Sequence, residues 1–270
     1  MFRERGIEIK TPAQIATMRE AGIVVAETLE LLRAAVAPGV TTRQLDQRAE
    51  EYIRSRGATP NFLGYHGYPA TICTSVNEQV VHAIPNDTPL EEGDVISIDC
   101  GAIVDGWHGD SAITLAVGEV SAELLELMRV CEESLWRGMA ATAPGGRVTD
   151  ISHAIETYVR SQGDYGIVED YVGHGIGSAM HMPPSVPNFG RPGKGPKLVE
   201  GLALAVEPMI TMGTIETEVL ADDWTVVTAD GSWSAHFEHS FTLTPDGALV
   251  LTALDGGASK LAELGVPCAG

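Results

Sequence analysis

Apolar residues recur at three- and four-residue intervals early in the chain, which predicts a pair of amphipathic helices. The first helix is expected over residues 13–37 and the second over 43–56. Thr11 precedes the first helix and Thr42 the second, and threonine is a common N-cap residue. Gly57 follows the second helix and is expected to end it.

The same pattern returns further along the chain, where helices are expected over 122–143 and 150–161. A shift of 106 residues places 37–57 on 143–163. The shifted segments share Ala-Pro-Gly, a terminal Gly, and Glu, Tyr, Arg and Ser at equivalent helical positions. Common helix-cap residues would explain the Pro-Gly and the terminal Gly alone. Together, the matches predict an internal duplication and a pseudo-twofold fold.

Between the helix pairs, residues 95–110 read VISIDCGAIVDGWHGD and predict a β-hairpin. An apolar run leads to Asp99, Asp105-Gly106 is a turn signal, and the chain then returns to Asp110. The midpoint between residues 99 and 110 falls between Val104 and Asp105, beside this turn, so Asp99 and Asp110 are expected to face each other across adjacent antiparallel strands. Two carboxylates at that distance repel each other unless one is protonated or a cation lies between them.

Composition restricts the class of protein. The chain has 270 residues, 44% of them hydrophobic, so it can bury a large core, and without a linker we expect one domain over 1–270. The net charge of −20 argues against nucleic acid or an anionic membrane as the main partner. Four cysteines without paired spacing, and no signal-peptide or membrane-spanning segment, predict a cytoplasmic protein with reduced thiols.

Further acids and one histidine lie among apolar residues in the second half of the chain. His174 lies in a GHGIG loop, Glu207 ends the apolar segment 202–208, and Glu238 lies in an alternating, strand-like segment. No Lys or Arg occurs within 95–128 or 198–238 to neutralise these acids. Any one of these residues could be structural, Asp99 as a capping group for example. As a set they predict a site for hard divalent cations such as Mn²⁺, Fe²⁺ or Co²⁺.

Four motifs together resemble the type I methionine aminopeptidases: IDCGAIVDGWHGD, GHGIG with a second His seven residues after its own, LAVEP and SAHFEH. The resemblance runs from about residue 10 to about residue 250. It implies the pita-bread α/β (α+β) fold, in which two duplicated helix-plus-antiparallel-strand halves surround a dinuclear metal site. It also implies a short form of the family without an N-terminal zinc-finger extension.

The resemblance also implies an activity, which is removal of the initiator methionine from nascent polypeptides when the second residue is small. The enzyme would use two divalent ions (Co, Mn or Fe), and a water that they activate would attack the scissile carbonyl. Nascent chains at the ribosome would be its partners, and we expect a cytoplasmic monomer. Two alternatives stay open: a proline-specific aminopeptidase of the same fold, and a non-catalytic binding protein that has kept the fold.

The family's metal ligands can be carried over by position. Asp99 resembles a ligand of one metal, Asp110 and Glu238 resemble the bridging pair, and His174 and Glu207 complete the other metal. Glu207 also resembles the general base.

The family's substrate-binding residues can be carried over in the same way. His181 resembles the imidazole that steadies the tetrahedral intermediate, and His82 the one that contacts the scissile amide or its N-terminal side. The methionine pocket maps onto residues that would otherwise be taken for ordinary core: Tyr65, Tyr68, Cys73, Met180 and Trp224.

The chain departs from the family's pattern at two positions. Phe62 occupies a small position at the rim of the pocket, and Gly101 stands where the family often has Thr. Both substitutions are expected to affect the pocket rather than the ligand set. Asn77, Gln79 and Ser234 match a family site for a monovalent cation.

Overall fold

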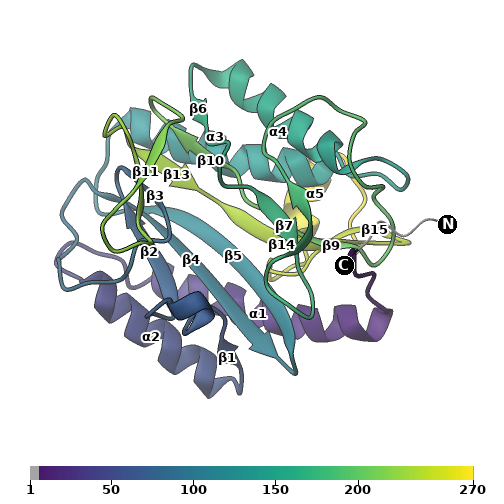
Figure 1. Cartoon of the computed structure of the whole chain (residues 1–270), viewed down its shortest axis with the longest axis horizontal. Coiled ribbons are helices and arrows are strands. Elements are labelled where there is room, and N and C mark those ends of the chain that lie inside the picture. The colour runs from purple at the N-terminus through teal and green to yellow at the C-terminus, as the bar shows by residue number, and fades with distance from the viewer. Residues whose placement is uncertain (1–5, 270) are drawn as a thin grey trace.

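The computed structural model describes residues 6–269, in which two helix pairs cover one face of a curved sheet (Figure 1). The first pair is α1 (Pro12–Arg33) and α2 (Thr42–Ser55), and the second is α3 (Ala122–Ala140) and α4 (Val148–Gln162). The range of α4 lies 106 residues after that of α2 with one extra residue at its end, as the predicted duplication requires. A 3₁₀ turn (Tyr65–Gly67) and a short helix, α5 (Ala258–Glu263), complete the helical elements of the described chain.

The main sheet is built from nine strands in the order β1-β4-β5-β14-β9-β7-β8, with β2 beside β4 and β15 beside β14. Neighbouring strands are antiparallel. Their bounds are β1 (Thr59–Pro60), β2 (Ile72–Val76), β4 (Val95–Val104), β5 (Trp107–Ala116), β7 (Gly173–Gly175), β8 (Met182–Val186), β9 (Ala203–Val206), β14 (Glu238–Thr244) and β15 (Gly247–Val250).

Two three-stranded sheets flank the main sheet, in the orders β13-β10-β6 and β11-β12-β3. Their bounds are β3 (Gln79–Val81), β6 (Gly166–Ile167), β10 (Met209–Thr211), β11 (Thr217–Val219), β12 (Val226–Thr228) and β13 (Ser234–His236). The strand predicted over 202–208 is β9, and Glu207-Pro208 lies between its end and β10.

The helices and the candidate acids lie on opposite faces of the central sheet. Ser111 and His239 line a cavity of about 260 Å³ that is bordered by α1 and α3. Because side chains alternate along a strand, the neighbouring residues Asp110 and Glu238 point to the other face. The helices thus cover one face of the sheet, and the acids project from the other.

The ends of the first two helices differ slightly from the prediction. Thr11 caps α1 as expected and accepts a hydrogen bond from the backbone N of Gln14, but the helix ends at Arg33 rather than at residue 37. Helix α2 is capped by Thr41, not by Thr42, which is its first residue. The Thr41 side chain accepts from Gln44 N, and the Gln44 side chain accepts from Thr41 N, in a capping box.

The 95–110 hairpin forms, but its register differs from the prediction by two residues. Asp99 pairs with Ala112, and Asp110 pairs with Gly101. The turn centres on Asp105-Gly106, and a two-residue turn there moves the expected pairing by two positions. Asp99 and Asp110 are thus diagonal neighbours rather than directly opposed.

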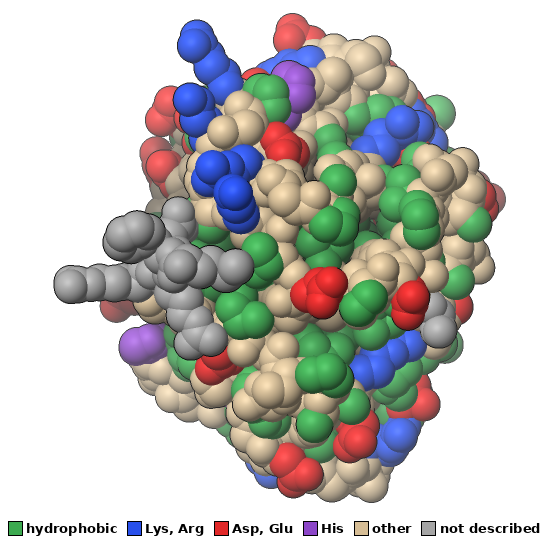
Figure 2. Space-filling model, turned by 90° about the vertical axis from the view of Figure 1, so that its right-hand side faces the viewer, with side chains coloured by type: hydrophobic (Ala, Val, Ile, Leu, Met, Phe, Trp, Pro, Cys, Tyr) green, Lys and Arg blue, Asp and Glu red, His purple; other side chains and the backbone are tan. Residues whose placement is uncertain are grey.

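Within residues 6–269, no helix is both long and apolar enough to cross a membrane. We expect no apolar leader at the N-terminus. Residues 1–5 of that segment lie outside the residues that the structure describes. On the face shown in Figure 2, acidic, basic and apolar side chains are interspersed and are not sorted by charge.

Candidate metal centre

Four adjacent strands at the middle of the main sheet each bring one carboxylate to the same place. Asp99 lies on β4, Asp110 on β5 and Glu238 on β14, and Glu207 directly follows β9. The fifth predicted residue, His174, lies on β7 and pairs with Ala205 of β9. The two halves of the chain therefore contribute two carboxylates each to one centre.

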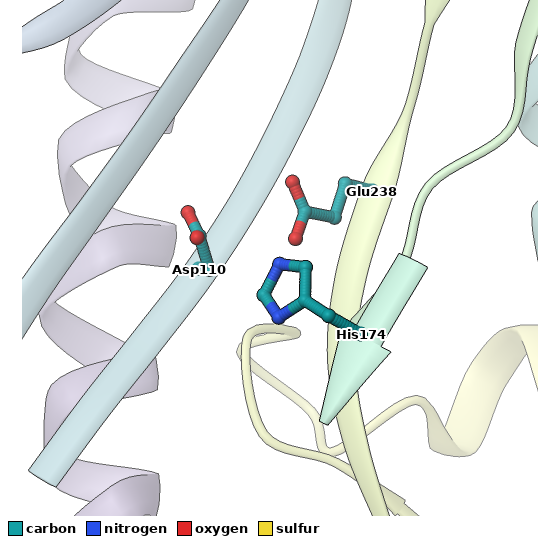
Figure 3. A group of neighbouring side chains, drawn as sticks. All are labelled: Asp110, His174 and Glu238. Atoms are coloured by element: carbon teal, nitrogen blue, oxygen red, sulfur yellow. The ribbon is translucent and has the colours of Figure 1, made fainter. Parts of the chain in front are cut away.

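The ligand atoms of Asp110, His174 and Glu238 all lie within 4.8 Å of one another, and these side chains point together in Figure 3. Glu207 extends this group, because its Oε1 lies 3.4 Å from His174 Nε2. Asp99 extends it on the other side, where its carboxyl lies close enough to the Asp110 carboxyl for each to affect the pKa of the other. All five residues predicted from the sequence thus form one continuous cluster.

Burial of the cluster penalises its negative charge. It raises the pKa of Asp99 from 3.8 to about 7. Burial, together with the charges of neighbouring carboxylates, also raises the pKa values of Asp110, Glu207 and Glu238 well above their usual range. In the protein alone, ionising all four groups is therefore unfavourable, and a cation would remove that penalty.

Three carboxylate oxygens in the cluster are buried and have no hydrogen-bond partner among the described residues: Asp99 Oδ1, Asp110 Oδ1 and Glu238 Oε1. The imidazole of His174 complements them. Burial lowers the pKa of His174 to about 4, so the ring is neutral, and its Nδ1 lies 3.0 Å from the carbonyl oxygen of Gly175. Nδ1–H donates to that carbonyl, which leaves the Nε2 lone pair directed at the acids. A divalent cation with hard oxygen ligands fits this donor set.

Hydrogen bonds to the backbone fix the strands that carry the acids. Ser111 Oγ donates to the Glu238 carbonyl at 2.5 Å, and Ser240 Oγ donates to the Asp110 carbonyl at 2.8 Å. These two bonds join β5 to β14 at the junction of the halves. Asn188 Nδ2 donates to the Glu207 carbonyl at 3.1 Å, which holds the residue between β9 and β10.

Of the two further histidines predicted from the sequence, His181 lies against His174 of the acidic cluster, and His82 lies near enough to His181 for the two rings to affect each other's charge. The ring centroids of His181 and His174 are 4.4 Å apart, and Tyr65 Oη lies 2.8 Å from His181 Nδ1. His82 has a φ of 61°, an uncommon conformation for a non-glycine residue and one often found at functional sites. Burial, with a smaller contribution from His181, lowers the pKa of His82 to about 4, so the ring is neutral.

The predicted pocket residues form one apolar cluster, separate from the main core. Its buried members are Phe62, Tyr68, Ala70, Cys73 and Met180, and Tyr65, Ile84 and Trp224 pack against them. The Tyr68 and Trp224 rings meet edge to face, with centroids 5.0 Å apart. Phe62 is 7% exposed within this cluster, so it forms part of the wall rather than the rim.

Four residues near the site were absent from the sequence prediction. Ala70 and Ile84 belong to the apolar pocket, and the ring centroids of Tyr171 and His82 are 5.7 Å apart. Asn61 contacts both Gly101 and His108. These residues carry no local pattern that marks them, and only the neighbouring motif residues Phe62 and His82 could have drawn attention to two of them.

The three residues of the expected monovalent-cation site also lie together. Ser234 Oγ donates to the Gln79 carbonyl at 3.0 Å and to the Asn77 carbonyl at 3.4 Å. Asn77 has a positive φ of 57°, which turns its backbone toward Ser234.

Comparisons with known proteins agree with this geometry. Residues 16–245 match the model of metallopeptidase family M24. A methionine aminopeptidase of Clostridium acetobutylicum is 52% identical over 247 residues, which cover 91% of this chain and 98% of that protein. Methionine aminopeptidase 1 of Mycobacterium tuberculosis is 52% identical over 254 residues, covering 92% of this chain and 96% of the relative.

Solved structures confirm the pita-bread fold class. A crystal structure of methionine aminopeptidase from Rickettsia prowazekii superposes with a TM-score of 0.89 at 42% identity, covering 92% of this chain and 100% of that chain. The prolidase from Pyrococcus furiosus superposes with a TM-score of 0.69 at 20% identity, covering 91% of this chain and 65% of that one. The second likeness concerns the fold alone.

Proposed function

The chain belongs to metallopeptidase family M24, and from that premise we propose that it is a methionine aminopeptidase that removes the N-terminal methionine of peptides and nascent proteins. The observation that carries this proposal is the cluster of four carboxylates, two buried (Asp110 and Glu238) and two partly buried, with His174 at the junction of the two halves. Two relatives that are 52% identical in sequence over 91% and 92% of this chain have the same activity in their names. That agreement favours this function over a proline-specific peptidase or a binding protein.

The five clustered residues are proposed to hold two divalent ions, with Mn²⁺, Fe²⁺ or Co²⁺ as candidates. Asp99 would serve one ion, His174 and Glu207 the other, and Asp110 and Glu238 both. When bound, such ions polarise the scissile carbonyl and lower the pKa of water to a range useful for attack. Glu207 is proposed to accept the proton of the attacking water, because a carboxylate can serve as a general base and its Oε1 lies within the cluster, 3.4 Å from His174 Nε2.

The protein's own residues bind and orient the peptide. We propose that the pocket cluster holds the methionine side chain, since its aromatic rings and sulfur-bearing residues suit a thioether. His181, hydrogen-bonded to Tyr65, is proposed to donate to the oxygen on which charge develops. His82 is proposed to contact the scissile amide. Asn77, Gln79 and Ser234 are proposed to bind a monovalent cation through their carbonyl groups.

Nascent chains at the ribosome are the proposed physiological substrates. We also propose that the protein acts as a cytoplasmic monomer. One domain is proposed for the whole chain, since β5 pairs with β14 and the main sheet is continuous between the halves.

The function is tested by hydrolysis of two peptides, Met-Ala-Ser and Ala-Pro-Ala, after chelation and reloading with Mn²⁺, Fe²⁺ or Co²⁺. We expect cleavage of Met-Ala-Ser only, and only with metal. Preferred cleavage of Ala-Pro-Ala would favour the proline-specific alternative, and binding without cleavage of either would favour a binding protein. Glu207→Gln keeps the size of the side chain and should abolish turnover, whereas exposed Glu218→Gln serves as the control and should leave turnover unchanged.

A further inference from the structure

Gly101 on β4 has no side chain, which leaves a space over β4 and β5, the strands that carry Asp99 and Asp110. The side chain of Asn61 fills that space. A Cβ atom on residue 101 would lie 2.6 Å from Asn61 Nδ2 and 2.7 Å from Asn61 Cβ, both inside normal contact distance. Gly101 pairs directly with Asp110 and lies two residues after Asp99, so all three positions share one face of the sheet. The Asn61 carboxamide therefore lies on the face that carries the metal-centre acids.

Two hydrogen bonds fix the orientation of Asn61. Its backbone N donates to the Gly101 carbonyl at 3.0 Å, and its Oδ1 lies 2.6 Å from His108 Nδ1. An amide oxygen only accepts, so with Oδ1 at this contact the His108 tautomer is the one that carries a hydrogen on Nδ1 and donates it. With Oδ1 at His108, the amide nitrogen Nδ2 lies toward Gly101.

The amide nitrogen of Asn61 is a hydrogen-bond donor without an acceptor, and it lies on the same face as carboxylate oxygens that have no donor. Asn61 is 5% exposed, and its Nδ2 is buried with no hydrogen-bond partner among the described residues. Asp99 Oδ1 and Asp110 Oδ1, on the same strip of sheet, are also buried and unpartnered within the described chain. Unpartnered buried polar groups are uncommon in native proteins and call for a physical reason.

We propose that Asn61 is a positioning residue of the metal centre, whose Nδ2 donates to the Asp110 carboxylate when that group is ionised around a bound cation. A donor to the ionised form stabilises it and orients it, as outer ligand-supporting groups do in metal sites. As long as Asn61 is present, residue 101 must be glycine, because a Cβ there would displace the carboxamide. The inference rests on the proposed function only in requiring that the cluster binds a divalent cation.

The first test is the affinity of the chelated, full-length protein for Mn²⁺, measured by calorimetry without peptide. Asn61→Leu fills a similar volume but has no donor, and we expect its affinity to fall about 10- to 100-fold. Leu127→Ala, in the fully buried core of α3, serves as the control for lost stability and should bind Mn²⁺ as the wild type does. Unchanged affinity in Asn61→Leu would overturn the role of Asn61 and leave the proposed function intact. A wild-type chain that binds no Mn²⁺, Fe²⁺ or Co²⁺ would instead overturn the proposed function.

The second test exploits the contact between the two positions. Gly101→Thr alone should weaken Mn²⁺ binding, because its Cβ meets Asn61. Asn61→Ala alone should also weaken it, because the donor is lost. In the double variant, the threonine introduced at position 101 gains the vacated space and supplies a hydroxyl donor, so affinity should recover to within a few-fold of the wild type. A double variant no tighter than Asn61→Ala would contradict the proposal, since mere space-filling predicts no such recovery of metal affinity.

Discussion

For single residues, the parity of strand positions decides whether the acids can form one centre. Asp99 and Asp110 lie diagonally, two positions away from direct pairing, and an even displacement keeps both on the same face. A displacement by one residue would have turned one of them toward the helices. The prediction from the sequence thus had the wrong register, yet it had the right face. The chemistry of the site depends on the face.

The two aspartates are expected to differ in their effect on metal content. Asp110 shares the group with both His174 and Glu238, so Asp110→Asn should reduce binding at both metal positions. Asp99 contacts the cluster at its edge through Asp110, so Asp99→Asn should weaken mainly one position. Elemental analysis after dialysis against Mn²⁺ measures the number bound per chain, with exposed Asp246→Asn as the control. Equal losses in the two variants would contradict the proposed division of roles.

Removal of metal should make stability depend on pH with a defined sign. In the folded protein the pKa of Asp99 is raised from 3.8 to about 7, so the folded state holds this proton more tightly than the unfolded state. Stability contributed by the protonated group is present at low pH and is lost as pH rises from roughly 4 to 7. The other acids, whose pKa values are also raised, extend the loss to higher pH.

Chemical unfolding of chelated and Mn²⁺-loaded protein between pH 5 and pH 8 tests this dependence. The midpoint of the chelated protein should fall with rising pH, and the stabilisation by metal should grow, since fewer protons compete for the ligands. Asp99→Asn should flatten the curve of the chelated protein. Parallel curves with and without metal would show that the cluster does not govern the dependence.

Among the elements, close contact between α1 and the hairpin fixes where Asp110 lies. A Cβ on Gly109 would lie 2.9 Å from Gly22 N, and a Cβ on Gly22 would collide with the Leu251 carbonyl. Two glycines thus let the helix approach β5 and the end of β15 at backbone distance. Apolar periodicity predicted the helix and its buried face. It did not reveal that Gly22 was needed for contact with a segment more than two hundred residues away.

Gly22→Ala should therefore destabilise the protein although alanine favours helices. Overpacking of a tight contact costs roughly 1–3 kcal/mol, more than the ~1 kcal/mol gained in helix propensity. Chemical unfolding of the chelated protein measures the change, and exposed Glu20→Ala in the same helix is the control. Because β5 carries Asp110, metal affinity should fall as well. A stabilised Gly22→Ala variant would show that α1 can move away from the strand without cost.

For the whole molecule, the elements of each half were predicted from the sequence, and the structure shows how the two halves join into one main sheet. Helix pairs, the hairpin and the duplication were predicted from periodicity, capping residues and a shift of 106 residues. The five clustered residues were predicted from acids and a histidine placed among apolar residues, and the resemblance in four motifs added their roles and the pocket. The capping role of Thr41 is local, because Gln44 completes its capping box three residues on, and that pattern could have been found in the sequence. The position of Asn61 depends instead on its contact with His108, 47 residues away, which no local pattern encodes.

Because the two halves share one sheet, we expect them to unfold together. The sheet is continuous through β5 and β14, and Arg19 of α1 donates to the Leu251 and Leu254 carbonyls near the end of the second half. Ile53 in α2 and Val159 in α4 are equivalent under the duplication, and both are fully buried. Ile53→Ala and Val159→Ala should each cost about 2–4 kcal/mol, because each leaves a cavity in one half.

Hydrogen exchange measured separately on peptides from α2 and α4 tests whether the halves are coupled. Under conditions that favour global unfolding, either variant should increase exchange in both helices by the same factor. Mn²⁺, bound by residues of both halves, should slow exchange in both helices to the same extent. Exposed Glu51→Ala is the control and should change neither helix. Faster exchange confined to the substituted half would mean that each repeat unfolds independently, and the metal centre would then dissociate with whichever half opened first.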